Sequence, residues 1–135
     1  ELNSFANISI FHGVASDTEG EKTLYFDTFN PIKSSSVEFY DASNGSIKVK
    51  SFVLDSLLAG KKIDFIKIDT DGHDRNVIMG ARKVIETQRP VVIFEDAGGV
   101  PPNGISRETI NAFFARLGYE ITSIGSDNFL CVPLA

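Results

Sequence analysis

The stretch Ile63-Asp64-Phe65-Ile66-Lys67-Ile68-Asp69-Thr70-Asp71-Gly72-His73-Asp74 decides the fold of this chain. An apolar run ends abruptly in carboxylates, a glycine and a histidine. Apolar residues then recur at helical spacing up to Gln88, and a second apolar run, 91–94, ends in Glu95 and Asp96. This order predicts a strand, an acidic turn, a helix and a second strand that ends in another acidic turn. In open sheets built from such units, ligands sit beyond the carboxyl ends of the strands.

Shorter elements precede this unit. Alternation of apolar and polar residues predicts strands over 8–14, 22–27 and 47–52, the first two forming a hairpin or lying near one another, and a short helix over 54–58. Residues 30–46 are rich in Ser, Asn, Gly and Pro and predict a long, mobile, exposed loop.

The central unit itself is regular. The strand over 63–68 is mostly apolar, which is typical of a strand covered on both faces. The helix that follows is expected over 74–88, with Asp71 or Asp74 capping its first turn. Ser106 is expected to cap a further helix. The apolar face of that helix and the glycine that ends it are Ile110, Phe113, Phe114, Leu117 and Gly118.

The chain ends in two strand patterns, 119–124 and 128–132, which predict an antiparallel hairpin. Cys131 lies in the second of them and is expected to be a small buried residue. The order of elements predicts a single α/β domain over residues 1–135, with a mostly parallel sheet and this antiparallel hairpin at its C-terminal end.

Composition narrows the functional classes. The 135 residues carry a formal net charge of -5 and a single cysteine, which argues against nucleic-acid binding and excludes an internal disulfide. No apolar run reaches the length of a membrane span and no signal peptide is visible, so we expect a cytoplasmic protein. The chain begins at Glu1 and its only methionine is Met79, so we expect a fragment or a processed product.

The acidic turns carry the candidate chemistry. Carboxylates that gather beyond adjacent strands suit Mg²⁺ or Mn²⁺, and His73 could add a nitrogen ligand or act as a general base. The competing interpretation is structural: Asp71 and Asp74 would only cap a helix, Gly72 would only form a tight turn, and His73 would only be a solvated residue of the first helical turn. Asp69 ends a buried strand, where no helix cap is needed. This position favours a functional role for Asp69 over a structural one. The carboxylates expected to gather are Asp69, Asp71, Asp74, Glu95 and Asp96.

Residues 65–73 resemble the signature of haloacid-dehalogenase-type phosphohydrolases, four apolar residues followed by Asp-x-Asp-Gly-Thr. That resemblance implies Asp69 as nucleophile and Asp71 as acid/base, with Mg²⁺ nearby. The signature opens the domain in that family, whereas here it lies at mid-chain. No lysine follows Lys83 to supply the basic residue that the family needs. We keep this reading as an alternative.

A second resemblance covers nearly the whole chain. Its motifs are Val14–Gly20, Leu54-Asp55-Ser56-Leu57, the stretch 63–74, Gly80-Ala81, Arg89-Pro90 and the apolar strand that ends in Glu95. Together they resemble the C-terminal part of an FkbM-type S-adenosylmethionine-dependent methyltransferase. The resemblance implies part of a Rossmann-like methyltransferase sheet and methyl transfer from S-adenosylmethionine to an oxygen or nitrogen of a small-molecule or glycan acceptor.

The resemblance also implies residue roles. The cofactor would be bound near its adenine edge and its methionine end by Val14, Ala15, Ser16, Asp69 and Thr70. The acceptor would be bound by Asp71, Gly72 and Glu95. Either Asp69 or His73 would act as the catalytic base.

This sequence departs from the family upstream. The family's Asp-x-Gly-Ala-Asn-x-Gly-type loop and its first two strands are not in it, so we expect a truncated domain that is inactive unless the missing half is supplied. The missing strands would leave the strand over 63–68 with an unpaired edge. We therefore expect either an early strand to move in beside it or a homodimer joined through that edge. A non-catalytic, self-associating remnant is a third alternative.

Overall fold

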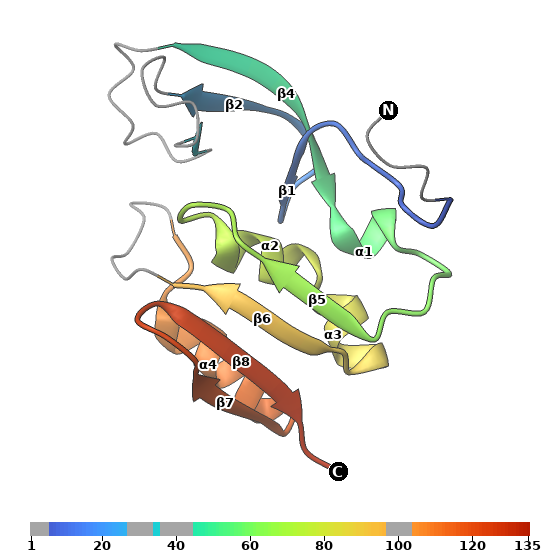
Figure 1. Ribbon diagram of the computed structural model, residues 1–135, viewed down its shortest axis with the longest axis vertical. Helices are drawn as coiled ribbons and strands as arrows, with labels where there is room; N and C mark the ends of the chain where they lie inside the picture. Colours follow the sequence, from blue (N-terminus) through green and yellow to red (C-terminus); the bar gives the residue numbers. More distant parts are fainter. Residues whose placement is uncertain (1–5, 27–33, 36–44, 97–103) are drawn as a thin grey trace.

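The computed structural model describes residues 6–26, 34–35, 45–96 and 104–135, which form two four-stranded mixed sheets and four helices (Figure 1). The α/β class is confirmed. The loop predicted over 30–46 lies outside the described residues, except for β3 (Ser34–Ser35) and residues 45–46. No described helix has both the length and the apolar character needed to cross a membrane.

The first sheet has the order β1-β4-β2-β3. β1 (Val14–Ser16) runs parallel to β4 (Ser46–Val53), and β2 (Gly20–Phe26) runs antiparallel to β4. The hairpin expected between the first two predicted strands is therefore wrong, because β4 lies between them. The strand expected over 8–14 is also shorter and later. A Cβ on Gly13 would lie 2.3 Å from the Lys50 carbonyl oxygen, so the chain meets the β4 backbone closely just before β1 begins.

The second sheet has the order β5-β6-β8-β7. Its strands are β5 (Phe65–Ile68), β6 (Val91–Glu95), β7 (Tyr119–Ser123) and β8 (Asn128–Pro133). Among the strands that the structure describes in this sheet, only β5 and β6 are parallel, while β6–β8 and β7–β8 are antiparallel. The predicted C-terminal hairpin is confirmed, but the mostly parallel sheet is wrong because β8 turns back beside β6. The Rossmann-like arrangement stays a prediction.

One face of the second sheet carries the core. Ile66 and Ile68 of β5 are buried there, together with Val92 and Phe94 of β6, and α4 (Arg107–Arg116) packs Phe114 against Phe94. On the opposite face of β5, Phe65 is 54% exposed and Lys67 is exposed as well. The prediction that this strand is covered on both faces is therefore wrong. Cys131 is fully buried in β8, as predicted.

The outer edge of β5 is free of strand partners within the described part of the chain, since β5 pairs only with β6. The expectation that an early strand moves in beside it is wrong, because β1, β2 and β4 stay together in the first sheet. Figure 1 shows β1 and β5 in separate sheets, on the sides of the sheets that face each other, and the two strands do not pair.

The helix predicted over 74–88 is divided at Ala81 into α2 (Asp74–Gly80) and α3 (Arg82–Gln88). The Asp55 carboxylate, on α1 (Leu54–Leu57), accepts hydrogen bonds from the backbone N–H groups of Lys83 and Val84, both at 2.9 Å. These are amides of the first turn of α3 that have no partner within that helix. The Leu-Asp-x-Leu motif therefore caps a helix that is distant in sequence.

The two cap predictions for α4 are confirmed. Ser106 Oγ accepts a hydrogen bond from Thr109 N at 3.1 Å at the start of α4, and Gly118 has the left-handed φ of 67° expected after its end. The Arg89 guanidinium donates to the carbonyl oxygens of Leu117 and Gly118, where the dipole of α4 favours a positive charge.

Candidate functional site

The acidic turn follows β5 directly and bends sharply. Asp69 is exposed and forms an ion pair with Lys67 two residues earlier. Asp71 has a φ of 49° and Gly72 a φ of 98°, so two successive residues adopt left-handed backbone. A glycine adopts this region without steric cost, which confirms the prediction of a tight turn at Gly72.

Asp74 holds this turn together from the first position of α2. Its buried carboxylate accepts hydrogen bonds from Thr70 Oγ1 at 3.0 Å, from Thr70 N at 3.3 Å and from Gly72 N at 3.3 Å. The helix cap expected from Asp71 or Asp74 is wrong: His73 is the N-cap residue, and its side chain forms no cap hydrogen bond. Burial raises the pKa of the Asp74 carboxyl, against the lowering effect of its hydrogen bonds.

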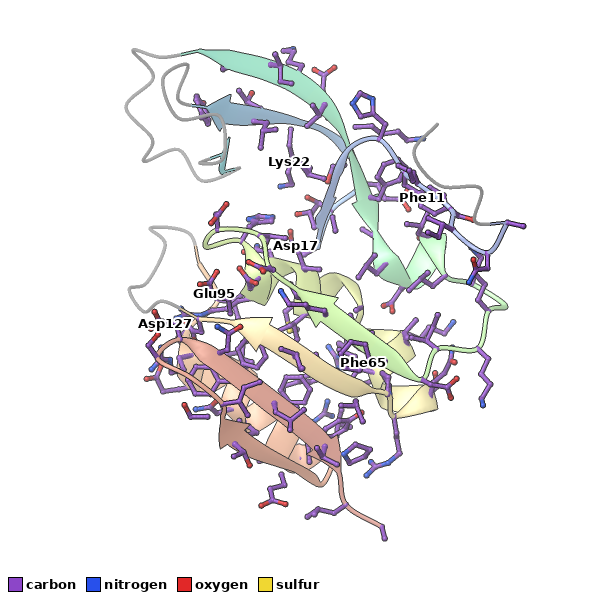
Figure 2. All side chains as sticks on the ribbon, in the orientation of Figure 1. Phe11, Asp17, Lys22, Phe65, Glu95 and Asp127 are labelled. Carbon is purple, nitrogen blue, oxygen red and sulfur yellow. The ribbon has the colours of Figure 1, made fainter. Side chains whose placement is uncertain are left out.

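Glu95 completes a group of four carboxylates. It ends β6, next to the acidic turn that ends β5 (Figure 2). Burial is the largest cause of the raised pKa of Glu95. The pKa is raised further by the negative charges of Asp69, Asp74 and Asp71 and by a hydrogen bond with Asp69. The structure thus brings together four of the five carboxylates that the sequence predicted.

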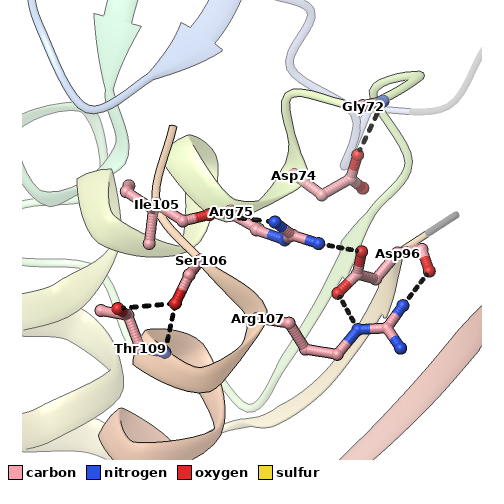
Figure 3. Close-up of polar contacts among 8 residues, drawn as sticks. All are labelled: Gly72, Asp74, Arg75, Asp96, Ile105, Ser106, Arg107 and Thr109. Atoms are coloured by element: carbon pink, nitrogen blue, oxygen red, sulfur yellow. Dashed lines mark hydrogen bonds and ion pairs between the residues drawn. The ribbon is translucent and has the colours of Figure 1, made fainter. Parts of the chain in front are cut away.

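The fifth, Asp96, is held by arginines instead. Its buried carboxylate lies 2.6 Å from Arg75 Nη2 and 2.8 Å from Arg107 Nε, and its carbonyl oxygen accepts a further bond from Arg107 (Figure 3). Arg75 also donates to the Ile105 carbonyl oxygen at 3.0 Å. This network fixes the end of β6 relative to α2 and α4. Neither arginine was predictable as a partner of Asp96, because no periodic pattern in the sequence relates them to it.

The stretch predicted to lie at the adenine edge is β1. Val14 and Ala15 are half-buried and Ser16 is fully buried. Ser16 Oγ lies 2.9 Å from His73 Nε2 and donates to Asp17 Oδ1 at 2.9 Å. The structure therefore joins β1 to the acidic turn through His73, which is only 9% exposed.

A surface hollow of the molecule lies apart from these carboxylates, and the carboxylates themselves are not arranged as metal ligands in the described residues. This hollow, of about 300 Å³, lies beside β4 and α1; its lining is Glu19, Gly20, Lys50, Ser51, Phe52, Val53, Ser56 and Leu57. Within the described ranges, no three His, Cys, Asp or Glu side chains are arranged to hold a metal ion. No observation in the described residues therefore favours the phosphohydrolase alternative.

The fold and the site define an α/β protein with an anionic site beyond the carboxyl ends of two neighbouring parallel strands. A family model described as Methyltransferase FkbM domain matches residues 3–121. The chain belongs to this FkbM methyltransferase family, so the suspected family is confirmed. Comparisons with curated proteins and with solved structures gave no match.

Proposed function

We propose that this chain binds S-adenosylmethionine and a methyl acceptor at the carboxyl ends of β5 and β6, and transfers a methyl group to an oxygen or nitrogen of the acceptor. The family match over residues 3–121 carries this proposal. The position of the four carboxylates supports it, because ligands of open α/β sheets sit at this end of the strands.

The charge of the site suits the cofactor. Asp69, Asp71, Asp74 and Glu95 give a negative potential that attracts cations, and both the sulfonium and the amino group of S-adenosylmethionine are cationic. Asp69 and Thr70 would hold the methionine end. Val14, Ala15 and Ser16 would lie towards the adenine, and the Ser16–His73 contact supports placing β1 beside the acidic turn.

S-adenosylmethionine, when bound, supplies an electrophilic methyl group. The residues of the chain would align the acceptor and remove its proton. We assign the base to Asp69, whose exposed carboxylate can reach an acceptor, and keep His73 as the second candidate. The acceptor proton would pass to Asp69, and the acceptor lone pair would form the bond to the methyl carbon as the sulfur–methyl bond breaks, so that S-adenosylhomocysteine leaves. The acceptor would be bound by Asp71, Gly72 and Glu95, the last of which ends β6 beside the acidic turn.

Calorimetric titration with S-adenosylmethionine tests this proposal in a matched pair of variants. Asp69→Asn and Asp64→Asn remove the same charge from opposite ends of one strand, and the Asp64 carboxylate forms an exposed ion pair with Lys62 at 3.0 Å. We expect Asp69→Asn to weaken binding about tenfold, as for the loss of a hydrogen bond to a charged group, and Asp64→Asn to leave it unchanged. No binding, or equal effects in both variants, would contradict the proposed site.

A second candidate function is self-association, which the free outer edge of β5 favours within the described residues. We infer that two copies pair antiparallel through β5 about a two-fold axis at Ile66. Residues directly opposite one another then share a face of the joined sheet, so Phe65 lies opposite Lys67 of the second copy. The Phe65 ring and the Lys67 ammonium of the second copy attract each other in this arrangement, and no residues of like charge lie opposite one another.

A further inference from the structure

A chain of polar groups, buried at Ser16 and His73, joins the acidic turn to β1. Ser16 Oγ lies 2.9 Å from His73 Nε2, and Ser16 also contacts Asp17 Oδ1 at 2.9 Å. On its other oxygen, the Asp17 carboxylate accepts a hydrogen bond from Asn76 Nδ2 at 3.2 Å. Asp17 lies where the first sheet approaches α2 (Figure 2). Residues from two separate segments thus form one continuous network.

Proton counting fixes the direction of this chain. The Ser16 hydroxyl has a single hydrogen, and the Asp17 carboxylate, which can only accept, takes it. The contact with His73 therefore needs a proton on Nε2, which donates to Ser16 Oγ. A ring nitrogen that already donates to a buried serine is not the atom that removes a proton from an acceptor.

The surroundings keep this imidazole neutral. Burial lowers the pKa of His73 first, and the positive charge of Lys22 on β2 lowers it further, against the raising effect of Asp17. A neutral ring with its proton on Nε2 carries none on Nδ1. The contacts around His73 thus select one tautomer.

The other side of Ser16 is fixed by backbone packing. A Cβ on Gly80 would lie 2.0 Å from the Ser16 carbonyl oxygen, so the last turn of α2 lies directly against β1. From the N-terminal end of that helix, His73 contacts Ser16, and Asn76 donates to Asp17, the residue that follows β1. A shift of β1 would therefore move the acidic turn, which is continuous with α2.

We propose that His73 is a positioning residue: its Nε2–H donates to Ser16 Oγ and holds the acidic turn of residues 69–74 in register with β1. The geometric part stands on the contacts alone, whereas the benefit to methyl transfer rests on the proposed function. His73 orients the turn that carries Asp69, and Asp69 meets the acceptor.

Two NMR measurements on the intact chain test the geometric part. Long-range ¹⁵N–¹H spectra should show neutral His73 with its proton on Nε2. In Ser16→Ala, amide hydrogen exchange at residues 70–74 should rise about fivefold, as for the loss of one neutral hydrogen bond. The matched control is Ser51→Ala, which removes another buried hydroxyl, bonded to the Thr18 carbonyl oxygen at 2.6 Å, and should leave exchange at 70–74 unchanged.

A proton on Nδ1, or equal exchange in the two serine variants, would overturn the proposal. If Ser16→Ala does not fold, His73→Gln and His73→Leu replace it. The glutamine amide can still donate to Ser16, so exchange at 70–74 should rise less in His73→Gln than in His73→Leu. Equal increases would contradict the proposed hydrogen bond.

The catalytic part has its own readout. In a methyl-transfer assay, His73→Gln should retain more kcat/KM than His73→Leu, and both should keep the pH profile of the wild-type chain. Loss in both variants of the acidic limb of that profile, where a general base becomes protonated, would instead make His73 the base. Failure to bind S-adenosylmethionine would overturn the proposed function, but the tautomer and exchange results would still decide the contact.

Discussion

At Asp74 and Glu95, burial raises the pKa of two carboxyl groups that have different partners. The Asp74 carboxylate accepts three hydrogen bonds from Thr70 and Gly72, which offset part of its desolvation. Glu95 instead faces the negative charges of the acidic turn. A carboxyl held among like charges lowers the stability of the folded state, and such a group is typical of a site that binds a cation.

We predict that Glu95→Gln raises the free energy of unfolding at pH 7. The raised pKa means that the folded state disfavours ionised Glu95, so the wild-type chain gains stability as the pH falls through that pKa. The advantage of the variant should therefore shrink on acidification and vanish below about pH 4, where glutamate is protonated in both states. Urea denaturation across this pH range measures the difference.

Glu86 provides the matched control with the opposite sign. Hydrogen bonds from Arg82 and Arg116 lower its pKa, so Glu86→Gln should reduce stability slightly at pH 7, and this loss should fade as the pH falls. An increase at pH 7 for both variants would mean that loss of any carboxylate stabilises this acidic chain.

Residue-level prediction succeeded where local geometry decides. The turn at Gly72 and the N-cap at Ser106 depend on a few neighbouring residues. The placement of Asp96 between Arg75 and Arg107 depends on tertiary distances, and the sequence contains no signal that separates Asp96 from its neighbour Glu95.

Among the elements, the division of the predicted helix at Ala81 is the clearest departure from the sequence pattern. The apolar spacing continues through residues 77–85, so periodicity alone predicts one helix. The division lies where Gly80 meets the Ser16 carbonyl oxygen and where Asp55 caps α3. Both partners are distant in sequence and therefore invisible to a local pattern.

We predict that Gly80→Ala destabilises the fold. The added methyl group would lie 2.0 Å from the Ser16 carbonyl oxygen, which belongs to backbone and cannot rotate away. The cost should be about 1–3 kcal/mol, the range for overpacking, despite the higher helix propensity of alanine. Gly125→Ala is the control, because no atom lies within 4 Å of the added Cβ. Thermal or urea unfolding that finds equal effects would exclude close packing of α2 on β1.

At the scale of the whole molecule, the two sheets each have one parallel pair within the described ranges, β1–β4 and β5–β6. The sequence predicted β2, the strands from β4 onwards and the C-terminal hairpin, because their patterns are local. Which strands pair was not predictable in the same way. Pairing of β4 between β1 and β2 and of β8 between β6 and β7 depends on long-range contacts.

We predict dimerisation through β5, measured by light scattering at increasing protein concentration. Phe65→Lys would place lysines opposite one another and should weaken the dimer about tenfold, since two cross-strand pairs of ~0.5–1 kcal/mol are lost. Ile124→Lys is the control: Ile124 is 49% exposed, similar to the 54% of Phe65, but lies between β7 and β8. A monomer at all concentrations would exclude the paired edge.

The most direct test of the proposed methyltransferase site is a titration of the ¹⁵N-labelled chain with S-adenosylmethionine, followed amide by amide. We expect saturable shifts at residues 14–16 and 69–73, where β1 meets the acidic turn. Shifts confined to the hollow beside Phe52, or none up to about 1 mM cofactor, would contradict the proposed site.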